Sequence, residues 1–213
     1  MKLYGYFRSS AAFRLRIALN LKKLRYDNAS IHLRRGAQRR PDYLGVNPQG
    51  LVPALEIDGQ RLIQSLPIIE YLDETHPEPP LLPGDAAGRA RVRALAAIVA
   101  CDIHPLNNLR VLRYLQNSLG HGQDAIAAWY NHWIAAGFAA FERLLAEDRR
   151  TGAFCHGEAP GLADIALVPQ VVNAERYRLD LAPYPAIMRI FNTCMQLDAF
   201  AAAHPEQQPD RDE

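Results

Sequence analysis

The sequence predicts an α/β domain followed by an all-helical domain, and three observations carry this prediction. Strand and helix signals alternate over the first 80 residues, a proline-rich break follows, and Ala-rich helical patterns fill the rest. Charge divides the chain at the same place: residues before 81 include 12 basic and 8 acidic side chains, and those after it 12 and 15. We therefore expect domains at residues 1–80 and 86–213, joined by a linker at 81–85.

The first domain is expected to follow the order β-α-β-α-β-β-α. Its third and fourth strands flank Asp58-Gly59, a strong hairpin signal, and Ser65 is expected to cap the last helix. This order is that of a thioredoxin-like domain. The strands are expected at 2–7, 27–33, 53–57 and 61–64, and the helices at 10–24, 41–46 and from 65 onward.

The second domain reads as helical throughout. Helices are expected at 86–118, 123–148, 162–178 and 184–197, with Pro105 kinking or breaking the first of them. Asp164 follows Gly161 by three residues, the spacing of a capping box at a helix start. Residues 204–213 are polar, so we expect them to be frayed.

Composition excludes several classes of function. A net charge of +1 favours neither nucleic acid nor an anionic membrane. No apolar run approaches the ~20 residues that cross a bilayer, and an early charge argues against a signal peptide. Three separated cysteines indicate reduced thiols, and hence a cytoplasmic protein. The histidines and cysteines lack the spacing of a metal site, so we expect none.

The most informative segment is the predicted junction of the first strand and helix, which carries Ser9 and Ser10. Backbone N–H groups and the helix dipole favour an anion at such a helix start. A serine O–H can donate to a thiolate that a ligand supplies. Plain helix capping accounts for one of these serines equally well.

Two further pieces of the first domain point to peptide binding. In Asn47-Pro48-Gln49-Gly50-Leu51-Val52-Pro53, a cis bond before Pro53 would turn the backbone of Val52 toward a ligand, but the sequence leaves cis and trans open. Gln64-Ser65 stands at a helix start, a good place for an amino-acid carboxylate. For Ser65 alone, a bare helix cap is the simpler explanation.

Together these pieces resemble the zeta class of the glutathione transferase family across essentially the whole chain. The resemblance rests on Ser9-Ser10-x-x-Phe13-Arg14-x-Arg16-Ile17-Ala18-Leu19, on Gln64 to Leu72, and in the helical half on Pro105 to Leu109, Leu162 to Gln170 and Asn173 to Arg176. Ala11 replaces the cysteine of the class signature, and Phe13 replaces its tryptophan.

The resemblance implies a glutathione site and a homodimer. Ser9 would donate to the glutathione thiolate, with Ser10 supporting it, as the catalytic pair. The other glutathione contacts implied are Gln38, Gln49, Val52, Pro53, Gln64, Ser65, His104 and Asn108.

The activity implied is glutathione-dependent cis–trans isomerisation of maleylpyruvate to fumarylpyruvate in aromatic acid catabolism, by reversible thiolate addition to the cis double bond. Arg8, Arg110 and Arg176 would hold the carboxylates of this small dicarboxylic keto acid. His104, where the class commonly has Gln, and Arg110 favour maleylpyruvate over maleylacetoacetate. Further alternatives are glutathione conjugation or dehalogenation of small acids, and a non-catalytic binding module.

Overall fold

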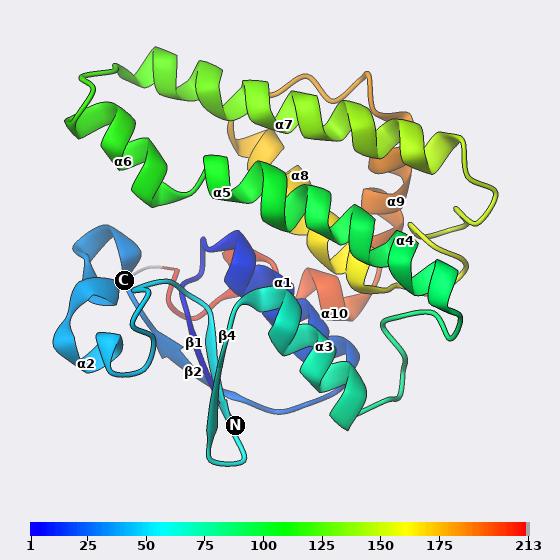
Figure 1. Cartoon of the computed structure of the whole chain (residues 1–213), viewed down its shortest axis with the longest axis horizontal. Helices are drawn as coiled ribbons and strands as arrows, with labels where there is room; N and C mark the ends of the chain where they lie inside the picture. Colours follow the sequence, from blue (N-terminus) through cyan, green and yellow to red (C-terminus); the bar gives the residue numbers. More distant parts are fainter. Residues whose placement is uncertain (212–213) are drawn as a thin grey trace. The chain divides into compact units, whose positions relative to one another are not determined.

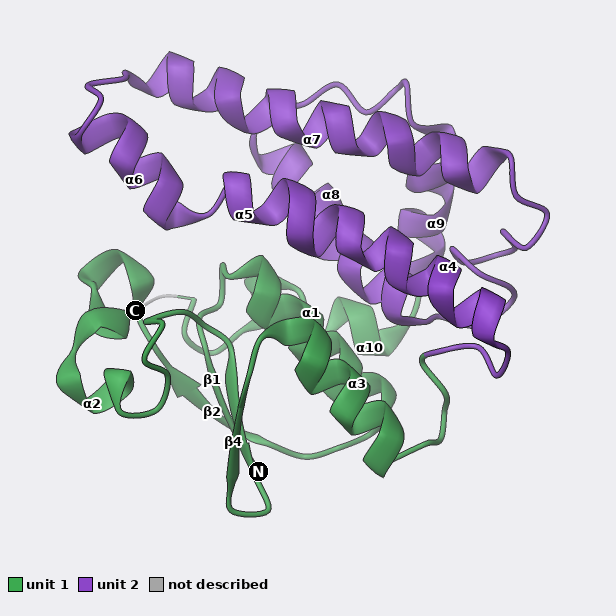
Figure 2. Cartoon of the chain, in the orientation of Figure 1, with its two compact units in different colours: residues 1–81, 195–213 green, residues 82–194 purple. Residues whose placement is uncertain are grey.

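The computed structural model describes residues 1–211, which form two compact units (Figure 2). Unit 1 joins Met1–Leu81 to the chain from Met195 onward, and unit 2 is Leu82–Cys194. The sequence analysis assigned everything after residue 86 to the helical domain. The contacts instead group the chain from Met195 with the first unit, because its helix α10 (Asp198–Ala201) packs on α1 (Ser10–Leu21).

Unit 1 is built on a mixed four-stranded sheet in the order β2-β1-β3-β4 (Figure 1). β1 pairs in parallel with β2 and antiparallel with β3, which forms a hairpin with β4. The predicted hairpin turn is confirmed: Asp58 and Gly59 both have positive φ, as the twist of a tight hairpin requires. The strands are β1 (Lys2–Gly5), β2 (Asp27–Ser30), β3 (Ala54–Ile57) and β4 (Gln60–Ile63).

The helices of unit 1 cover the sheet and fill its loops. α1 and α3 pack against each other and bury apolar side chains such as Phe13, Leu15 and Ile69. The remaining helical segments are short and lie in loops. Besides α1, α10 and α3 (Ser65–Thr75), they are η1 (Leu33–Arg35), η2 (Ala37–Arg39), α2 (Pro41–Leu44) and η4 (Pro205–Gln207).

Unit 2 is helical in every regular element that the structure describes. Its first helix continues through a π-helical turn into α5 and breaks at Asn107 and Asn108, just after Pro105, as expected. Asp164 accepts a hydrogen bond from Gly161 N–H, which is the capping contact that the spacing predicted. The helices are α4 (Ala86–Ala97), η3 (Ile98–Ile103), α5 (His104–Leu106), α6 (Leu109–Asn117), α7 (Gln123–Ala146), α8 (Leu162–Arg176) and α9 (Pro185–Met195).

Two expectations about helix α1 and the C-terminal tail are wrong. In the sequence, the apolar residues Ala11, Ala12, Leu15, Ala18 and Leu19 form a helical stripe that predicts an amphipathic helix. In the structure, every residue of α1 from Ser10 to Leu19 is buried. The tail from His204 to Arg211, expected to be frayed, contains η4 and the buried Asp210. Both errors have one cause, since the returning chain covers the side of α1 that the sequence left to solvent; residues 212–213 lie outside the described part.

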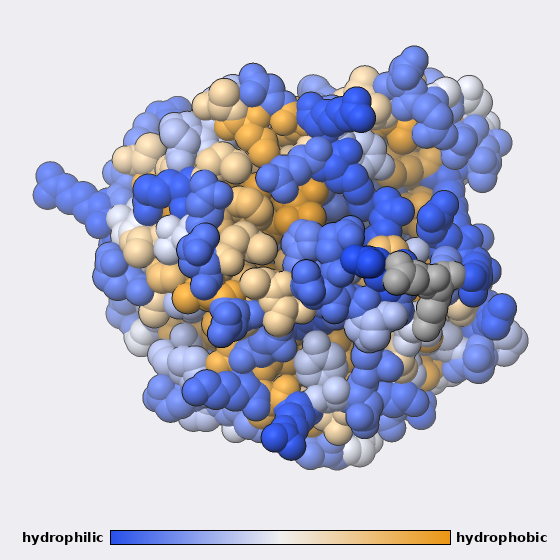
Figure 3. All heavy atoms as spheres, turned by 180° about the vertical axis from the view of Figure 1, so that it is seen from behind, coloured by the Kyte–Doolittle hydropathy of each residue, from blue (hydrophilic) through white to orange (hydrophobic). Residues whose placement is uncertain are grey.

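Among the described residues, no helix is both long and apolar enough to cross a membrane. Hydrophilic side chains are spread over the face drawn in Figure 3, with smaller hydrophobic areas between them.

Candidate functional site

Ser9 stands at the N-terminus of α1 and caps it. Its Oγ accepts a hydrogen bond from Ala12 N–H at 3.2 Å, and its own N–H donates to Tyr6 O at 2.9 Å. The capping contact that the sequence analysis weighed against a catalytic role is therefore present. The two roles are compatible, because capping uses an acceptor lone pair and leaves the Ser9 O–H free to donate. Ser10 follows as the first helical residue and is buried.

Two arginines of α1 hold this turn in place, and both are buried. Arg16 donates to the carbonyls of Phe7 at 3.1 Å and of Ala203 at 3.0 Å, and burial lowers its pKa to about 10. Arg14 donates from Nη1 to Ser65 Oγ at 3.2 Å. The turn that carries Ser9 is thus tied to the helix start that carries Ser65.

The sequence analysis gave these two arginines no role. A usable signal was present, since Arg14 and Arg16 interrupt an otherwise apolar helical run. A charged residue is almost never fully buried without partners. Their burial therefore required a set of acceptors, which only the fold identifies.

Gln64 and Ser65 occupy the start of α3, with one correction to the prediction. Ser65 was expected to cap this helix, but it is the first helical residue and Gln64 holds the cap position with φ 71°. That left-handed backbone is uncommon for a residue other than glycine and is often found at functional sites. The Gln64 side chain donates to Gln49 Oε1 at 2.8 Å, so two predicted residues meet directly.

The loop that carries Gln49 is anchored from behind by buried polar groups. Asn47 is 1% exposed; its Nδ2 donates to Leu51 O at 2.8 Å, and its Oδ1 accepts from Gln49 N–H. Gly50, at φ 62°, packs so close to the Gln38 carbonyl that a Cβ would lie 3.0 Å from it. These contacts place Gly50, the neighbour of Gln49, against the Gln38 carbonyl.

Gln38 and the Val52–Pro53 bond complete this side. Gln38 is 6% exposed, and its Oε1 has no hydrogen-bond partner among the described residues. The peptide bond before Pro53 is cis, which settles the alternative that the sequence left open. A buried, unsatisfied amide oxygen is a group that a peptide N–H can satisfy.

Two helix ends of unit 2 are tied to one stretch of α7. Asn107 Nδ2 donates to the carbonyl of Tyr130 at 3.0 Å, which ties the break between α5 and α6 to α7. Tyr177 stacks on Tyr130 with ring centroids 3.6 Å apart, and its carbonyl accepts from Asn131 Nδ2. The end of α8 is therefore tied to the same turn of α7.

The predicted residues of unit 2 sit at these helix ends. His104 begins α5, and Asn108 caps α6 by accepting the N–H of Arg110 at 3.1 Å. Arg110 and Arg176 are exposed, and the Arg176 guanidinium lies 5.2 Å from the Tyr177 ring. In unit 1, Arg8 is likewise exposed, beside Ser9. Exposed guanidinium groups at helix ends can reach an acidic ligand.

No metal centre is found in the part of the chain that the structure describes. It contains no group of three or more His, Cys, Asp or Glu side chains that could hold an ion. The three cysteines, Cys101, Cys155 and Cys194, are free. Burial is the main reason why the pKa values of the Cys155 and Cys194 thiols are raised, so neither is a reactive thiolate near neutral pH.

Comparison with known proteins gives matches over most of the chain. The family model "Glutathione S-transferase, N-terminal domain" matches residues 3–80, and "Glutathione S-transferase, C-terminal domain" matches residues 123–193. A maleylpyruvate isomerase of Ralstonia sp is 52% identical over 99% of both chains. A maleylacetoacetate isomerase of Pseudomonas aeruginosa is 47% identical, over 99% of this chain and 98% of that one.

Solved structures agree with the sequence matches. A holo maleylpyruvate isomerase, described as a bacterial zeta-class glutathione S-transferase, is 52% identical and superposes with a TM-score of 0.97 over 99% of both chains. A maleylacetoacetate isomerase of Methylobacterium extorquens AM1, solved with malonate and glutathione, is 43% identical with a TM-score of 0.96 over 98% of both. This chain belongs to the glutathione transferase family, and within it to the zeta class.

Proposed function

We propose that this protein catalyses the glutathione-dependent cis–trans isomerisation of maleylpyruvate to fumarylpyruvate. The observation that carries the proposal is the 52% identity, over 99% of both chains, with a maleylpyruvate isomerase, joined to an anion-binding turn at Ser9 that has no protein thiol of its own. Maleylacetoacetate is the second candidate substrate, because relatives named for that activity are nearly as similar. Aromatic acid catabolism is the setting in which such a substrate arises.

Glutathione is the proposed cofactor, held mainly by unit 1. It supplies, when bound, a thiolate that adds reversibly to the cis double bond so that the bond can rotate. Ser9 O–H donates a hydrogen bond that keeps the sulfur anionic, and the first N–H groups of α1 add their positive dipole. The residues that we propose for it are Ser9, Ser10, Gln38, Gln49, Val52, Pro53, Gln64, Ser65, His104 and Asn108.

The start of α3 suits the amino-acid end of glutathione. Ser65 accepts from Arg14 and keeps its own proton to donate, while the helix N–H groups favour a carboxylate. Gln49 and Gln64 are already joined by a hydrogen bond, so part of the ordering of this surface precedes binding. A preorganised surface of this kind favours tight, specific binding of one cofactor.

The acidic substrate is assigned to three exposed arginines. Arg8, Arg110 and Arg176 would hold its carboxylates and stabilise the negative charge that grows on its keto end during addition. The Arg176 guanidinium lies over the Tyr177 ring, which in turn stacks on Tyr130. We also propose that the protein is cytoplasmic, in line with its three free cysteines. We propose that it forms a homodimer, as members of the family usually do.

The proposal is tested by following maleylpyruvate absorbance with and without glutathione. We expect turnover only with glutathione, no net consumption of it, and a higher kcat/KM on maleylpyruvate than on maleylacetoacetate. Ser9→Ala should lower kcat/KM about 100-fold by removing one donor to an anionic centre. Ser118→Ala, at an exposed serine of unit 2, is the matched control and should leave it unchanged.

The possible failures are distinct. A rate independent of glutathione would refute the isomerase mechanism. Stoichiometric loss of glutathione would indicate conjugation instead, and absence of glutathione binding would indicate a non-catalytic module. A preference for maleylacetoacetate would replace the substrate but keep the reaction.

A further inference from the structure

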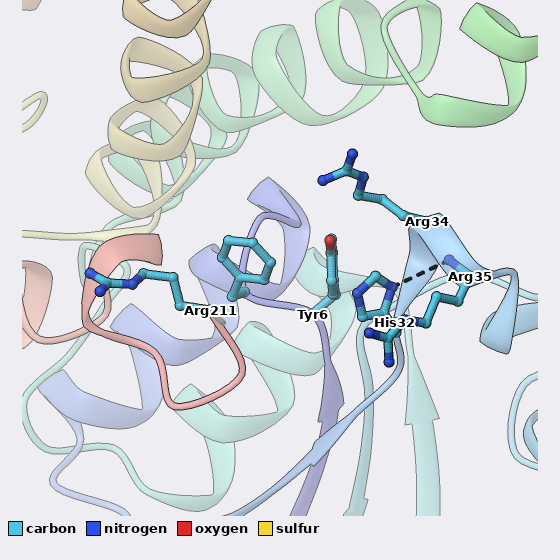
Figure 4. A pocket seen from close by; sticks show the side chains of 6 residues that line it. Tyr6, His32, Arg34, Arg35 and Arg211 are labelled. Atoms are coloured by element: carbon cyan, nitrogen blue, oxygen red, sulfur yellow. Dashed lines mark hydrogen bonds between the residues drawn. The ribbon is translucent and has the colours of Figure 1, made fainter. Parts of the chain in front are cut away.

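Unit 1 contains a pocket of about 430 Å³ that the proposed glutathione contacts do not use (Figure 4). Its walls come from the end of β1, from the chain around η1 and from the C-terminal tail. Two of its residues are aromatic, one is a histidine and three are arginines. They are Tyr6, Phe7, His32, Arg34, Arg35 and Arg211.

Tyr6 gives this pocket a buried hydrogen-bond donor without a partner. The residue is 4% exposed, and its hydroxyl has no hydrogen-bond partner among the described residues. Its ring is fixed by edge contact with Phe7 at 4.8 Å and by His32 at 5.2 Å. In Figure 4 the Tyr6 hydroxyl and the Arg34 guanidinium are directed to the same side of the pocket. An unsatisfied buried hydroxyl is unfavourable, so its retention points to a ligand.

The charges around Tyr6 are mostly positive. Burial raises the pKa of Tyr6, so the hydroxyl keeps its proton near neutral pH, while the charges of Arg8, Arg34 and Arg35 act in the opposite direction. Arg34 is exposed and makes no hydrogen bond or ion pair to any described residue. A neutral O–H donor beside an uncommitted guanidinium favours an anion.

Two acidic side chains lie near the pocket and offset only part of the positive charge of its arginines. Asp210 is buried, and its Oδ2 accepts from Phe7 N–H at 3.0 Å and from the Ser30 hydroxyl at 3.2 Å. Glu206 accepts from Arg211 at 3.4 Å and so commits part of that arginine's charge. The positive side of the pocket is therefore the one that Arg34 faces.

We propose that this pocket binds the carboxylate of a small organic acid, with Arg34 and the Tyr6 hydroxyl as donors and the rings of Phe7 and His32 as walls. A planar guanidinium matches a carboxylate with two parallel hydrogen bonds, and a phenol O–H adds a third. The aromatic walls suit the carbon chain of an organic acid better than a bare inorganic ion.

The carboxylate can come from two sources. One is the far end of the substrate, in which case the site extends the proposed function and rests on it. The other is a separate organic acid of the cell, which would make the pocket a site of its own. Both sources share the same chemistry at Tyr6 and Arg34, so binding is measured first and kinetics second.

The binding experiment titrates succinate into the full chain with glutathione present, by calorimetry. We expect Tyr6→Phe and Arg34→Gln each to weaken succinate binding about tenfold, the loss of one charge-assisted or buried hydrogen bond. Arg25→Gln removes the same charge at another exposed position of unit 1 and should change the dissociation constant less than twofold. Binding should persist in Arg176→Ala, which removes one of the three arginines proposed for the substrate.

A stability measurement separates a binding role from a structural one. Tyr6→Phe deletes a hydroxyl without a partner, so thermal unfolding should occur at the same or a higher temperature. Unchanged succinate affinity in Tyr6→Phe and Arg34→Gln, an equal loss in Arg25→Gln, or no binding by the wild-type chain would each overturn the proposal. None of these results depends on isomerase activity.

Kinetics on maleylpyruvate then identify the source. If Arg34→Gln raises KM while leaving glutathione affinity unchanged, the substrate supplies the carboxylate. If KM stays constant although succinate binding is lost, a separate organic acid is the ligand.

Discussion

Ser9 begins a helix that is buried on every side, whereas Arg176 ends a helix at an exposed position. The turn at Ser9 is fixed by Arg16 and by backbone contacts, and the start of α3 beside it is joined to α1 through Arg14. Arg176 is held by one ring contact, with Tyr177. The difference teaches that the turn carrying Ser9 is part of the core of unit 1, while Arg176 is a surface group of unit 2 that can change without refolding.

The largest expected effect on stability comes from replacing the buried Arg16. Arg16→Ala leaves the carbonyls of Phe7 and Ala203 without their donor and should lower the free energy of unfolding by about 3 kcal/mol. Denaturant unfolding measures this change. Arg25→Gln, at an exposed arginine of the same unit, should cost less than about 0.5 kcal/mol. Equal losses in the two variants would show that α1 is not held by Arg16.

Substitutions of the exposed Arg176 should change the activity of the enzyme and leave its stability unchanged. Arg176→Ala should lower kcat/KM for maleylpyruvate about 30-fold, the worth of a hydrogen bond between charged groups, with glutathione affinity within twofold of wild type. Arg176→Lys should recover part of the loss because it restores charge without the planar fork. A parallel fall in glutathione affinity would remove the substrate role of Arg176.

A third change tests how the helical unit positions His104. Gly137 in α7 lies so close to Ile103 that a Cβ would overlap the Ile103 side chain. Gly137→Ala should therefore lower the free energy of unfolding of the protein by about 1–2 kcal/mol. At a helix position with open space, the same substitution would raise it by up to about 1 kcal/mol. Gly137→Ala should also reduce turnover by displacing the turn that leads to His104. A rise in Tm would contradict this packing argument.

The smallest effect concerns pH and the C-terminal tail. His204 packs edge-on against Phe13, and burial lowers the pKa of His204 below its usual 6.5. The unfolded chain therefore binds a proton at His204 more readily than the folded chain. The contribution of neutral His204 to the free energy of unfolding is complete above pH 6.5 and is lost as the pH falls through the folded pKa. His204→Gln should reduce the change in the free energy of unfolding over this pH range by less than about 1 kcal/mol.

The control for this prediction is His121→Gln, at an exposed histidine of unit 2. His156 also has a pKa lowered by burial, with Arg91 and Arg150 adding to the effect, so the dependence should be reduced and not abolished. An unchanged slope in His204→Gln would show that the tail histidine does not couple to folding.

Much of unit 1 and the helical nature of unit 2 could be predicted, because their signals are local. Asp58-Gly59 predicts its hairpin, Pro105 its helix break and Asp164 its capping contact, each from a few neighbouring residues. The glutathione transferase family followed from motif order along the chain.

What could not be predicted depends on contacts distant in sequence. No residue near Arg14 or Arg16 in the sequence indicates that residues 198–203 will cover α1. The burial of these two arginines was therefore not predicted. The same contact makes the tail ordered when its composition suggests fraying. Gln64 as the helix cap, with positive φ, was also missed, since its conformation is imposed by the loop and not by its own preference.

Asp210 ties the tail to the amide of Phe7 and to Ser30, next to the turn of Ser9. A ribosome makes the chain in order, so it completes the whole of unit 2 before it makes the residue that locks unit 1. Unit 1 therefore lacks this contact until residue 210 has been made. A stop codon shortly before Asp210 would release a chain in which Phe7 N–H and the Ser30 hydroxyl lack this acceptor.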